Sequence, residues 1–312
     1  AFSAALAIVA DIARNATIPE DEMERERSVI LDEWAAHSVS AAQSARDILY
    51  RNAFSGHPYS RSPGGAASSI RKLQRSSLVE LYRRCFRPDR CILALAGDLS
   101  LAGARAIVGR CFGDWRASPE AERALPTFQF HSAPPVEAEV KTAGSAVGIA
   151  FLAPAAQEET AVCVAEVLAA LLRARLGTQA GSAERIVVTY SPRIDRSLLV
   201  ITVEIPAATL STLRGAEASI QAALENMRSQ PIPEQELEVA RTAAIARKES
   251  EIETCAGASD AIGYSAIVGG ANPFRHIELM KSLSYQTINA TIPSLLDARY
   301  SAIVLLEGTS VQ

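Results

Sequence analysis

IPEDEMERERSVILDEW, residues 18–34, decides the organisation of this chain, because its opening returns 214 positions later in IPEQELEVARTAAIARKES, residues 232–250. Both stretches begin with Ile-Pro-Glu, place acidic residues in the first turn and repeat apolar residues at helical spacing. Proline near the first helical position and acids in the first turn are typical of helix N-termini. The sequence therefore predicts two related helices, over residues 20–36 and 234–252.

Two further matches extend this repeat. HPY at residues 57–59 aligns with NPF at residues 272–274, and CILALAGD at residues 91–98 aligns with AIVLLEGT at residues 302–309. The three matches follow the same order at nearly the same spacing. Self-similarity of this kind indicates that a domain was duplicated.

The repeat predicts how the chain is divided. Residues 1–117 are expected to be the C-terminal part of a first domain, residues 118–135 a proline-containing linker, and residues 136–312 a second, homologous domain. By the spacing of the repeat, about 80 residues of the first domain are expected upstream of Ala1. The length of 312 residues agrees with two domains of ordinary size.

Helical and strand patterns occur in both parts of the chain. Short apolar, β-branched runs between turn residues predict strands, at residues 90–98, 145–154, 197–206 and 300–308. Helical periodicity predicts helices at residues 76–85, 101–112, 160–176 and 210–227. We expect an α+β fold of duplicated domains, each a mostly antiparallel sheet with helices packed on one face.

Composition excludes several kinds of partner. The chain is 48% hydrophobic and 21% charged, as in globular proteins, and its formal charge of -4 provides no broad basic surface for nucleic acid. No apolar run reaches the roughly 18 residues that cross a bilayer. We therefore expect neither a nucleic-acid partner nor a membrane span.

Glu26 and Glu33 are the residues that most suggest chemistry. They are seven positions apart, a rotation of about 700° that brings both carboxylates to one helix face. At the corresponding positions the second copy has Ala240 and Arg247. The helix start is thus common to both copies, whereas the carboxylates belong to one. The alternative is an ordinary solvated helix face with salt bridges.

Four motifs in the first part of the chain point to a known family: ERERSVILDEW (24–34), HPYSRSPGG (57–65), RPDRCILALAGDLS (87–100) and FGDW (112–115). In order and spacing they resemble the insulinase/pitrilysin family of zinc peptidases, which includes bacterial relatives of the mitochondrial processing peptidase. The resemblance implies a duplicated α+β domain, a zinc cofactor, and hydrolysis of unfolded peptides by a metal-activated water. It also implies that the second domain is of the inactive type.

The resemblance implies roles for both glutamates. Glu33 matches the third zinc ligand of the family, and Glu26 matches an acidic residue that orients a ligand histidine. The family motif His-x-x-Glu-His, which supplies the other two ligands and the general base, does not occur in this sequence. We expect it upstream of Ala1, so that residues 1–312 alone are expected to be inactive.

One departure from the family bears on partners. Its second domain commonly has an arginine and, seven residues later, a tyrosine that contact the substrate; Gly177 and Glu184 stand there in LGTQAGSAE, and no substrate-binding residue is assigned. The sequence fits the zinc-bearing chain of a two-chain peptidase, with a peptide substrate and a family partner in a homo- or heterodimer.

The four histidines are interpreted as follows. His37 follows Glu33 by one turn but has no ligand position in the family. His57 is expected to hold a turn, because its repeat partner is Asn272. His131 in the linker and His276 after NPF are expected to lie away from any site.

Three functions remain open. The first is a zinc metalloendopeptidase or its zinc-bearing subunit, the second a non-catalytic family member acting as a structural or substrate-recognition subunit, and the third a peptide-binding module. The paired glutamates favour the first, and the missing Arg/Tyr pattern favours the second. For the compartment, we expect the cytoplasm or periplasm of a bacterium.

Overall fold

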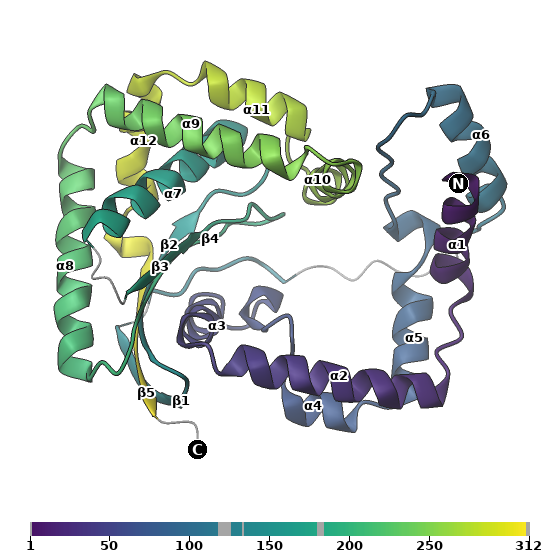
Figure 1. Ribbon diagram of the computed structural model, residues 1–312, viewed down its shortest axis with the longest axis horizontal. Helices are drawn as coiled ribbons and strands as arrows, with labels where there is room; N and C mark the ends of the chain where they lie inside the picture. Colours follow the sequence, from purple (N-terminus) through teal and green to yellow (C-terminus); the bar gives the residue numbers. More distant parts are fainter. Residues whose placement is uncertain (1, 118–125, 133, 180–183, 310–312) are drawn as a thin grey trace.

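The computed structural model describes residues 2–117, 126–132, 134–179 and 184–309. Within residues 2–117 the regular structure is helical (Figure 1) and comprises α1 (Phe2–Asn15), α2 (Glu20–Ser38), α3 (Ala41–Ala53), α4 (Ala67–Lys72), α5 (Arg75–Cys85), α6 (Leu101–Phe112) and the short 3-10 turns η1 (Pro58–Ser60) and η2 (Pro88–Arg90). In the ranges that are described, no helix combines the length and apolar character needed to cross a bilayer.

A five-stranded sheet forms in the second part of the chain, with the strand order β1-β5-β2-β4-β3. The strands are β1 (Val136–Lys141), β2 (Ser145–Ala153), β3 (Arg185–Thr189), β4 (Ser197–Ile205) and β5 (Ser301–Thr309). Neighbouring strands are antiparallel except β1 and β5, which are parallel. The predicted α+β class, the mostly antiparallel sheet and three of the four predicted strands are confirmed; β1 and β3 are not among the predicted strands.

The helices of the second part cover one face of this sheet, as predicted. The main core lies between the sheet and four helices: α7 (Glu159–Gln179), α8 (Leu210–Ser229), α9 (Glu234–Glu251) and α12 (Tyr285–Leu295). Two more helices, α10 (Cys255–Val268) and α11 (Pro273–Ser282), pack beside α9. Between α12 and β5 lies a third 3-10 turn, η3 (Ala298–Tyr300).

The other face of the sheet is covered by α3, which comes from the first part of the chain. Gly148 on β2 permits this close approach, because a Cβ there would lie 3.0 Å from Leu49 Cδ1 and 3.3 Å from Ala45 Cβ. Glu204 on β4 accepts hydrogen bonds from Ser40 Oγ and Ala42 N at the start of α3. The two parts of the chain thus share a core that the sequence pattern does not predict.

The two related helices are anchored by the same contact. Arg27 on α2 donates a hydrogen bond to the Leu73 carbonyl at 2.7 Å, and Arg241 on α9 donates one to the Leu283 carbonyl at 2.9 Å. Each arginine also pairs with the glutamate three residues before it. Equivalent contacts at equivalent positions support the duplication inferred from the sequence.

The strand predicted at residues 90–98 is not formed. Residues 91–96 have no neighbouring strand within the described ranges, and the side chains of Ile92 and Leu93 are 50% and 41% exposed. The corresponding β5 lies between β1 and β2 and is paired along both edges. An apolar, β-branched run becomes a strand only where another strand completes its hydrogen bonds.

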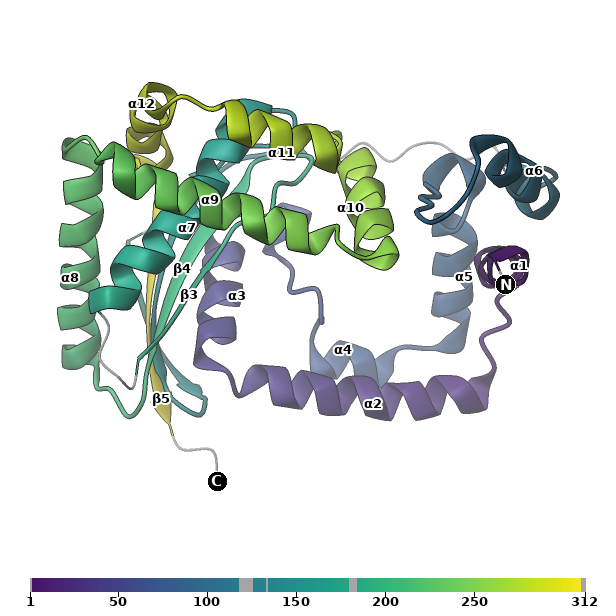
Figure 2. The same ribbon diagram turned by 45° about the horizontal axis from the view of Figure 1, so that its top comes forward.

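Beyond the sheet, the first part of the chain extends away from the core. Figures 1 and 2 show α2 running from α3 to α5, with α1 and α6 beside each other at the far end. Arg14 on α1 links these two helices by a hydrogen bond to the Cys111 carbonyl and an ion pair with Asp114. This arrangement leaves most of α2 exposed, and Met23 is its one buried residue.

Candidate functional site

Glu33 lies on α2 beside a cavity of about 650 Å³. The cavity is also lined by Trp34 and His37 of the same helix, by residues of α3 and of the segment 58–66, and by Arg193 from the loop between β3 and β4. Glu26 is exposed and is not among the lining residues. The structure therefore brings Glu33 and His37 to one cavity and leaves Glu26 outside it.

The residues around Glu33 do not by themselves fit a catalytic zinc ion. Such an ion needs about three protein ligands, drawn mostly from His, Cys, Asp and Glu. In the described part of the chain, no group of three or more such side chains is placed to share a metal. This agrees with the absence of a His-x-x-Glu-His motif from the sequence.

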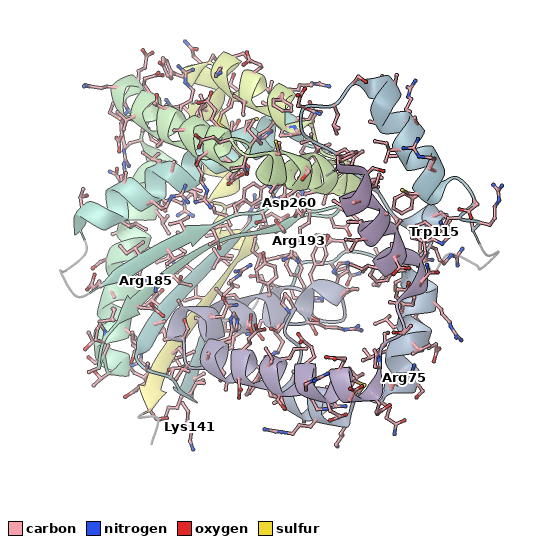
Figure 3. All side chains as sticks on the ribbon, turned by 45° about the vertical axis from the view of Figure 1, so that its right-hand side comes forward. Arg75, Trp115, Lys141, Arg185, Arg193 and Asp260 are labelled. Atoms are coloured by element: carbon pink, nitrogen blue, oxygen red, sulfur yellow. The ribbon has the colours of Figure 1, made fainter. Side chains whose placement is uncertain are left out.

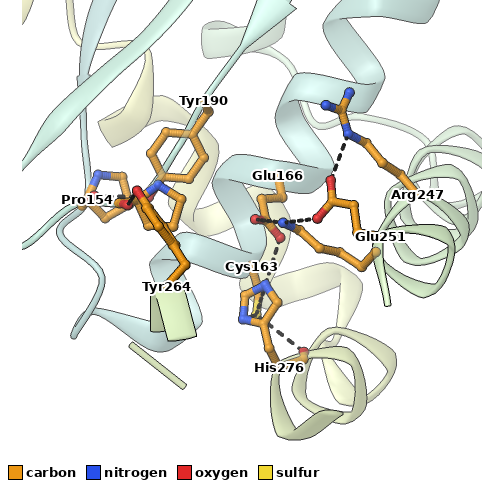
Figure 4. A network of polar contacts seen from close by, with 10 residues as sticks. Pro154, Cys163, Glu166, Tyr190, Arg247, Glu251, Tyr264 and His276 are labelled. Carbon is orange, nitrogen blue, oxygen red and sulfur yellow. Dashed lines mark hydrogen bonds and ion pairs between the residues drawn. The ribbon is translucent and has the colours of Figure 1, made fainter. Parts of the chain in front are cut away.

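A second cavity, of about 600 Å³, contains a buried network of charged residues between α7, α9 and α11. Figure 4 shows Glu166 of α7 at its centre. Glu166 Oε2 lies 2.7 Å from His276 Nε2, and Glu166 Oε1 lies 3.1 Å from Lys248 Nζ. Lys248 Nζ also lies 3.0 Å from Glu251 Oε2. The side chains of Glu166 and His276 are only 10% and 11% exposed.

The network keeps Glu166 and Lys248 charged at neutral pH. Burial acts to raise the pKa of Glu166, but the hydrogen bond with His276 and the charge of Lys248 outweigh it, so this pKa lies below its ordinary value. Burial acts to lower the pKa of Lys248, but Glu166 and Glu251 hold it above its ordinary value. A buried pair in which both partners stay charged holds α7 to α9.

Cys163 extends the network to a thiol, imidazole and carboxylate in series. Its Sγ lies 3.5 Å from His276 Nδ1. Burial, with a contribution from Glu166, raises the pKa of Cys163 to about 12. A nucleophilic cysteine needs a lowered pKa and access to substrate, whereas this thiol is protonated and completely buried. We interpret the series as structural.

His276 lines this second cavity, a contact that the sequence does not predict. Because the network is interpreted as structural, the expectation that His276 lies away from a functional site stays a prediction. The repeat contains a signal that identifies the region. Arg247 occupies the position of Glu33 in the second copy, and both Arg247 and Lys248 line this cavity. The related helix therefore brings ionisable residues to a cavity in each copy.

His57 and Asn272 hold equivalent turns, as the repeat predicted. His57 Nδ1 accepts a hydrogen bond from Tyr59 N at 3.2 Å, and Asn272 Oδ1 accepts one from Phe274 N at 3.0 Å. Both side chains cap the start of the helical turn that follows them. This role accounts for the Nδ1 atom of His57.

The segment that departs from the family lies at the end of α7. Gly177 is within this helix, and a Cβ added there would meet nothing within 4 Å. Residues 180–183 of LGTQAGSAE, like residues 118–125 and 133 of the predicted linker, fall outside the described residues. The lack of an Arg/Tyr pair and the domain boundaries stay predictions.

Comparison with known proteins gives a family match over more than half of the chain. Residues 72–244 match the family model described as "Peptidase M16 inactive domain". The match begins in α4 and ends within α9, so it spans the end of the first part of the chain and most of the second.

Several curated proteins are similar over a shorter stretch. The chain is 35% identical over 95 residues to cytochrome b-c1 complex subunit 1, mitochondrial, of Bos taurus, covering 30% of this chain and 20% of that protein. It is 34% identical over 116 residues to a probable mitochondrial-processing peptidase subunit beta of Schizosaccharomyces pombe, covering 37% and 25%. It is 31% identical over 109 residues to an uncharacterized zinc protease of Mycobacterium bovis, covering 35% and 25%. The aligned stretches span a quarter or less of these relatives' lengths.

Solved structures share the fold over nearly the whole chain. The crystal structure of a protease from Helicobacter pylori superposes with a TM-score of 0.82 at 15% identity, covering 98% of this chain and 76% of that one. At this identity, the likeness establishes a common architecture.

Proposed function

The chain belongs to the peptidase M16 family, the insulinase/pitrilysin family that its motifs resemble, and on this premise we propose that it is part of a zinc metalloendopeptidase acting on unfolded peptides. Glu33 supplies one zinc ligand, and Glu26 orients a ligand histidine. Within residues 1–312 no further zinc ligand and no general base is assigned. Zinc, when bound, supplies Lewis-acid activation of the attacking water.

The observation that carries this proposal is the difference between Glu33 and Arg247. Glu33 is exposed beside its cavity, and its side chain has no hydrogen bond or ion pair with other described residues. Arg247, its counterpart, lies 3.3 Å from Glu251 in an ion pair. At this position the first copy thus has a carboxylate that can bind a metal ion, whereas the second copy has an arginine in an ion pair.

Zinc content of the whole gene product tests the ligand assignment. We expect Glu33→Gln to lose about one zinc per chain, measured by inductively coupled plasma mass spectrometry after dialysis. Asp32→Asn removes a neighbouring exposed carboxylate from the same helix and is expected to leave the zinc content unchanged. Equal zinc in the wild type and Glu33→Gln would refute the assignment.

A second function, a non-catalytic structural or substrate-recognition subunit, has its own support. The matching family model is described as an inactive domain, and one relative is named as a subunit of the cytochrome b-c1 complex. The two proposals share a family partner chain, in a homo- or heterodimer. Zinc content and peptidase activity distinguish them. A gene product that binds no zinc and cleaves no unfolded peptide, alone or with its partner, is a non-catalytic subunit.

A further inference from the structure

Two arginines from distant parts of the chain meet over one tyrosine in the cavity next to Glu33. The guanidinium carbons of Arg46 on α3 and Arg193 in the β3–β4 loop lie 5.8 and 5.0 Å from the centre of the Tyr50 ring. Arg193 also lies 4.7 Å from the centre of the Tyr59 ring. Figure 3 shows Arg193 near the middle of the molecule, below α10 and above α2.

Among the residues that the structure describes, no carboxylate pairs with the guanidinium of Arg46 or of Arg193. Within the described ranges, neither Arg46 nor Arg193 makes a hydrogen bond or an ion pair through its side chain. Among the described lining residues there are four arginines and two carboxylates, those of Glu33 and Asp47, and Asp47 accepts a hydrogen bond from Gln43. The cavity is therefore positively charged in a chain whose net charge is negative.

The loop that holds Arg193 is fixed before any ligand arrives. The Arg193 carbonyl accepts a hydrogen bond from Ala156 N at 2.8 Å, and the preceding Pro192 carbonyl accepts one from Tyr264 Oη at 2.7 Å. The ring beneath the two cations is also fixed, because Tyr50 is 9% exposed and packs against Phe54. Such preorganisation lowers the entropic cost of binding.

A cation–π contact does not consume the N–H groups of a guanidinium. These groups can still donate two parallel hydrogen bonds to the oxygens of a carboxylate. Arg46 and Arg193 also line the same cavity, so an anion bound there would offset their like charges. Both effects favour a carboxylate ligand.

We propose that Arg46 and Arg193 form a carboxylate-binding subsite that selects peptides with an acidic side chain or a free C-terminus at this position. The inference rests on the proposed function in one respect, that the ligand is a peptide. It requires neither zinc nor hydrolysis, so it can be tested with all metal removed.

The test measures binding of three short fluorescent peptides to this chain by anisotropy in EDTA. The first peptide has a central Glu and an amidated C-terminus, the second has Gln in place of that Glu, and the third has this Gln with a free C-terminal carboxylate. We expect the first or the third to bind about tenfold tighter than the second, as for one hydrogen-bonded charge pair. The peptide that gains identifies the source of the carboxylate.

Matched variants locate the effect. Arg193→Gln and Arg46→Gln are each expected to abolish the roughly tenfold preference for the carboxylate-bearing peptide over the neutral peptide. Arg105→Gln removes the same charge from an exposed position on α6 and should retain the preference. Thermal unfolding checks that each variant is folded.

Three results would overturn the proposal: equal binding of all three peptides to the wild type, no binding of any of them, or a preference that survives in both cavity variants. Loss of zinc binding or of peptidase activity in the gene product would not produce any of these results. Failure of the subsite and failure of the zinc proposal are therefore distinguishable.

Discussion

The two copies of the repeat contain related helices in very different surroundings. α9 buries Leu237, Ala240 and Ala244, whereas α2 buries only Met23. α12 and α5 differ in the same direction, because α12 buries three residues and α5 buries none. Related sequences thus form the same local structure although only one copy has a sheet beneath it in the described residues.

The difference in burial between the two copies shows which features of these helices are determined by local sequence. Acidic first turns and the arginine contact are sufficient to define α2 and α9 in both settings. The apolar residues that would face a sheet remain exposed in the first part, for example Ile8 at 62%, Ile12 at 60% and Leu101 at 67%. Helices need only their own hydrogen bonds, but burial needs a partner surface.

The largest expected effect comes from the equivalent buried residues Leu237 and Met23. Leu237→Ala should lower the free energy of unfolding by about 3 kcal/mol, because it leaves a cavity in the main core. Met23→Ala is expected to cost clearly less, since α2 has few neighbours. Urea unfolding followed by circular dichroism measures both, and equal losses would contradict the contrast between the two copies.

An intermediate effect is expected for the buried charge network of the second copy. Glu166→Gln should cost about 2 kcal/mol at pH 7, because it leaves Lys248 without one of its buried partners. The pKa of Glu166 is lowered on folding, so its stabilisation is present above the unfolded value of about 4.3 and is lost as the pH falls through the folded value. Unfolding measured from pH 7 to pH 3 should show the variant approaching the wild type.

The first copy offers the matched control for this pH dependence. The hydrogen bond from Arg27 also lowers the pKa of Glu24, but the Glu24 side chain is exposed and its charge is screened by solvent. Glu24→Gln should therefore change the pH dependence far less than Glu166→Gln. The same change in both variants would show that burial of the network is unimportant.

The smallest expected effect concerns the turn that both copies cap. Asn272→Ala should cost about 1 kcal/mol, because Phe274 N loses its acceptor at the start of α11. Asn272→His introduces the residue that the first copy uses at this position and should cost less than Asn272→Ala, since its Nδ1 can accept the same bond. Thermal unfolding of the two variants decides whether the copies are interchangeable at this position.

Much of the fold could be predicted because its determinants are local. The predicted helices at residues 76–85, 101–112, 160–176 and 210–227 and the strands at residues 145–154, 197–206 and 300–308 are all present to within three residues at each end. β1 alternates apolar and charged residues, VEAEVK, which is typical of a half-buried strand; it is not among the predicted strands because these are inferred from apolar runs. The composition of residues 90–98 predicts a strand, but a strand needs a neighbouring strand to pair with, and none is present among the described residues.

The candidate site is less predictable, because its residues are distant in sequence. Glu33 stands out by its place in the repeat, yet the cavity beside it also needs Arg193, which reaches it from the β3–β4 loop. The buried charge network joins three helices through Glu166, Lys248 and His276. Their spacing along the chain does not predict that they are in contact.

The sequence by itself determined the duplication, the start of each related helix and the difference between Glu33 and Arg247, since periodicity, capping and alignment are properties of short stretches. Only the tertiary structure decided that α3 covers the second face of the sheet, that residues 91–96 stay unpaired within the described ranges, and that Arg46 and Arg193 meet over Tyr50. These outcomes depend on which distant surfaces come into contact. Strand pairing, burial and charge clusters each need two or more segments that are distant in the sequence. A pattern within one segment does not say which other segment it will contact.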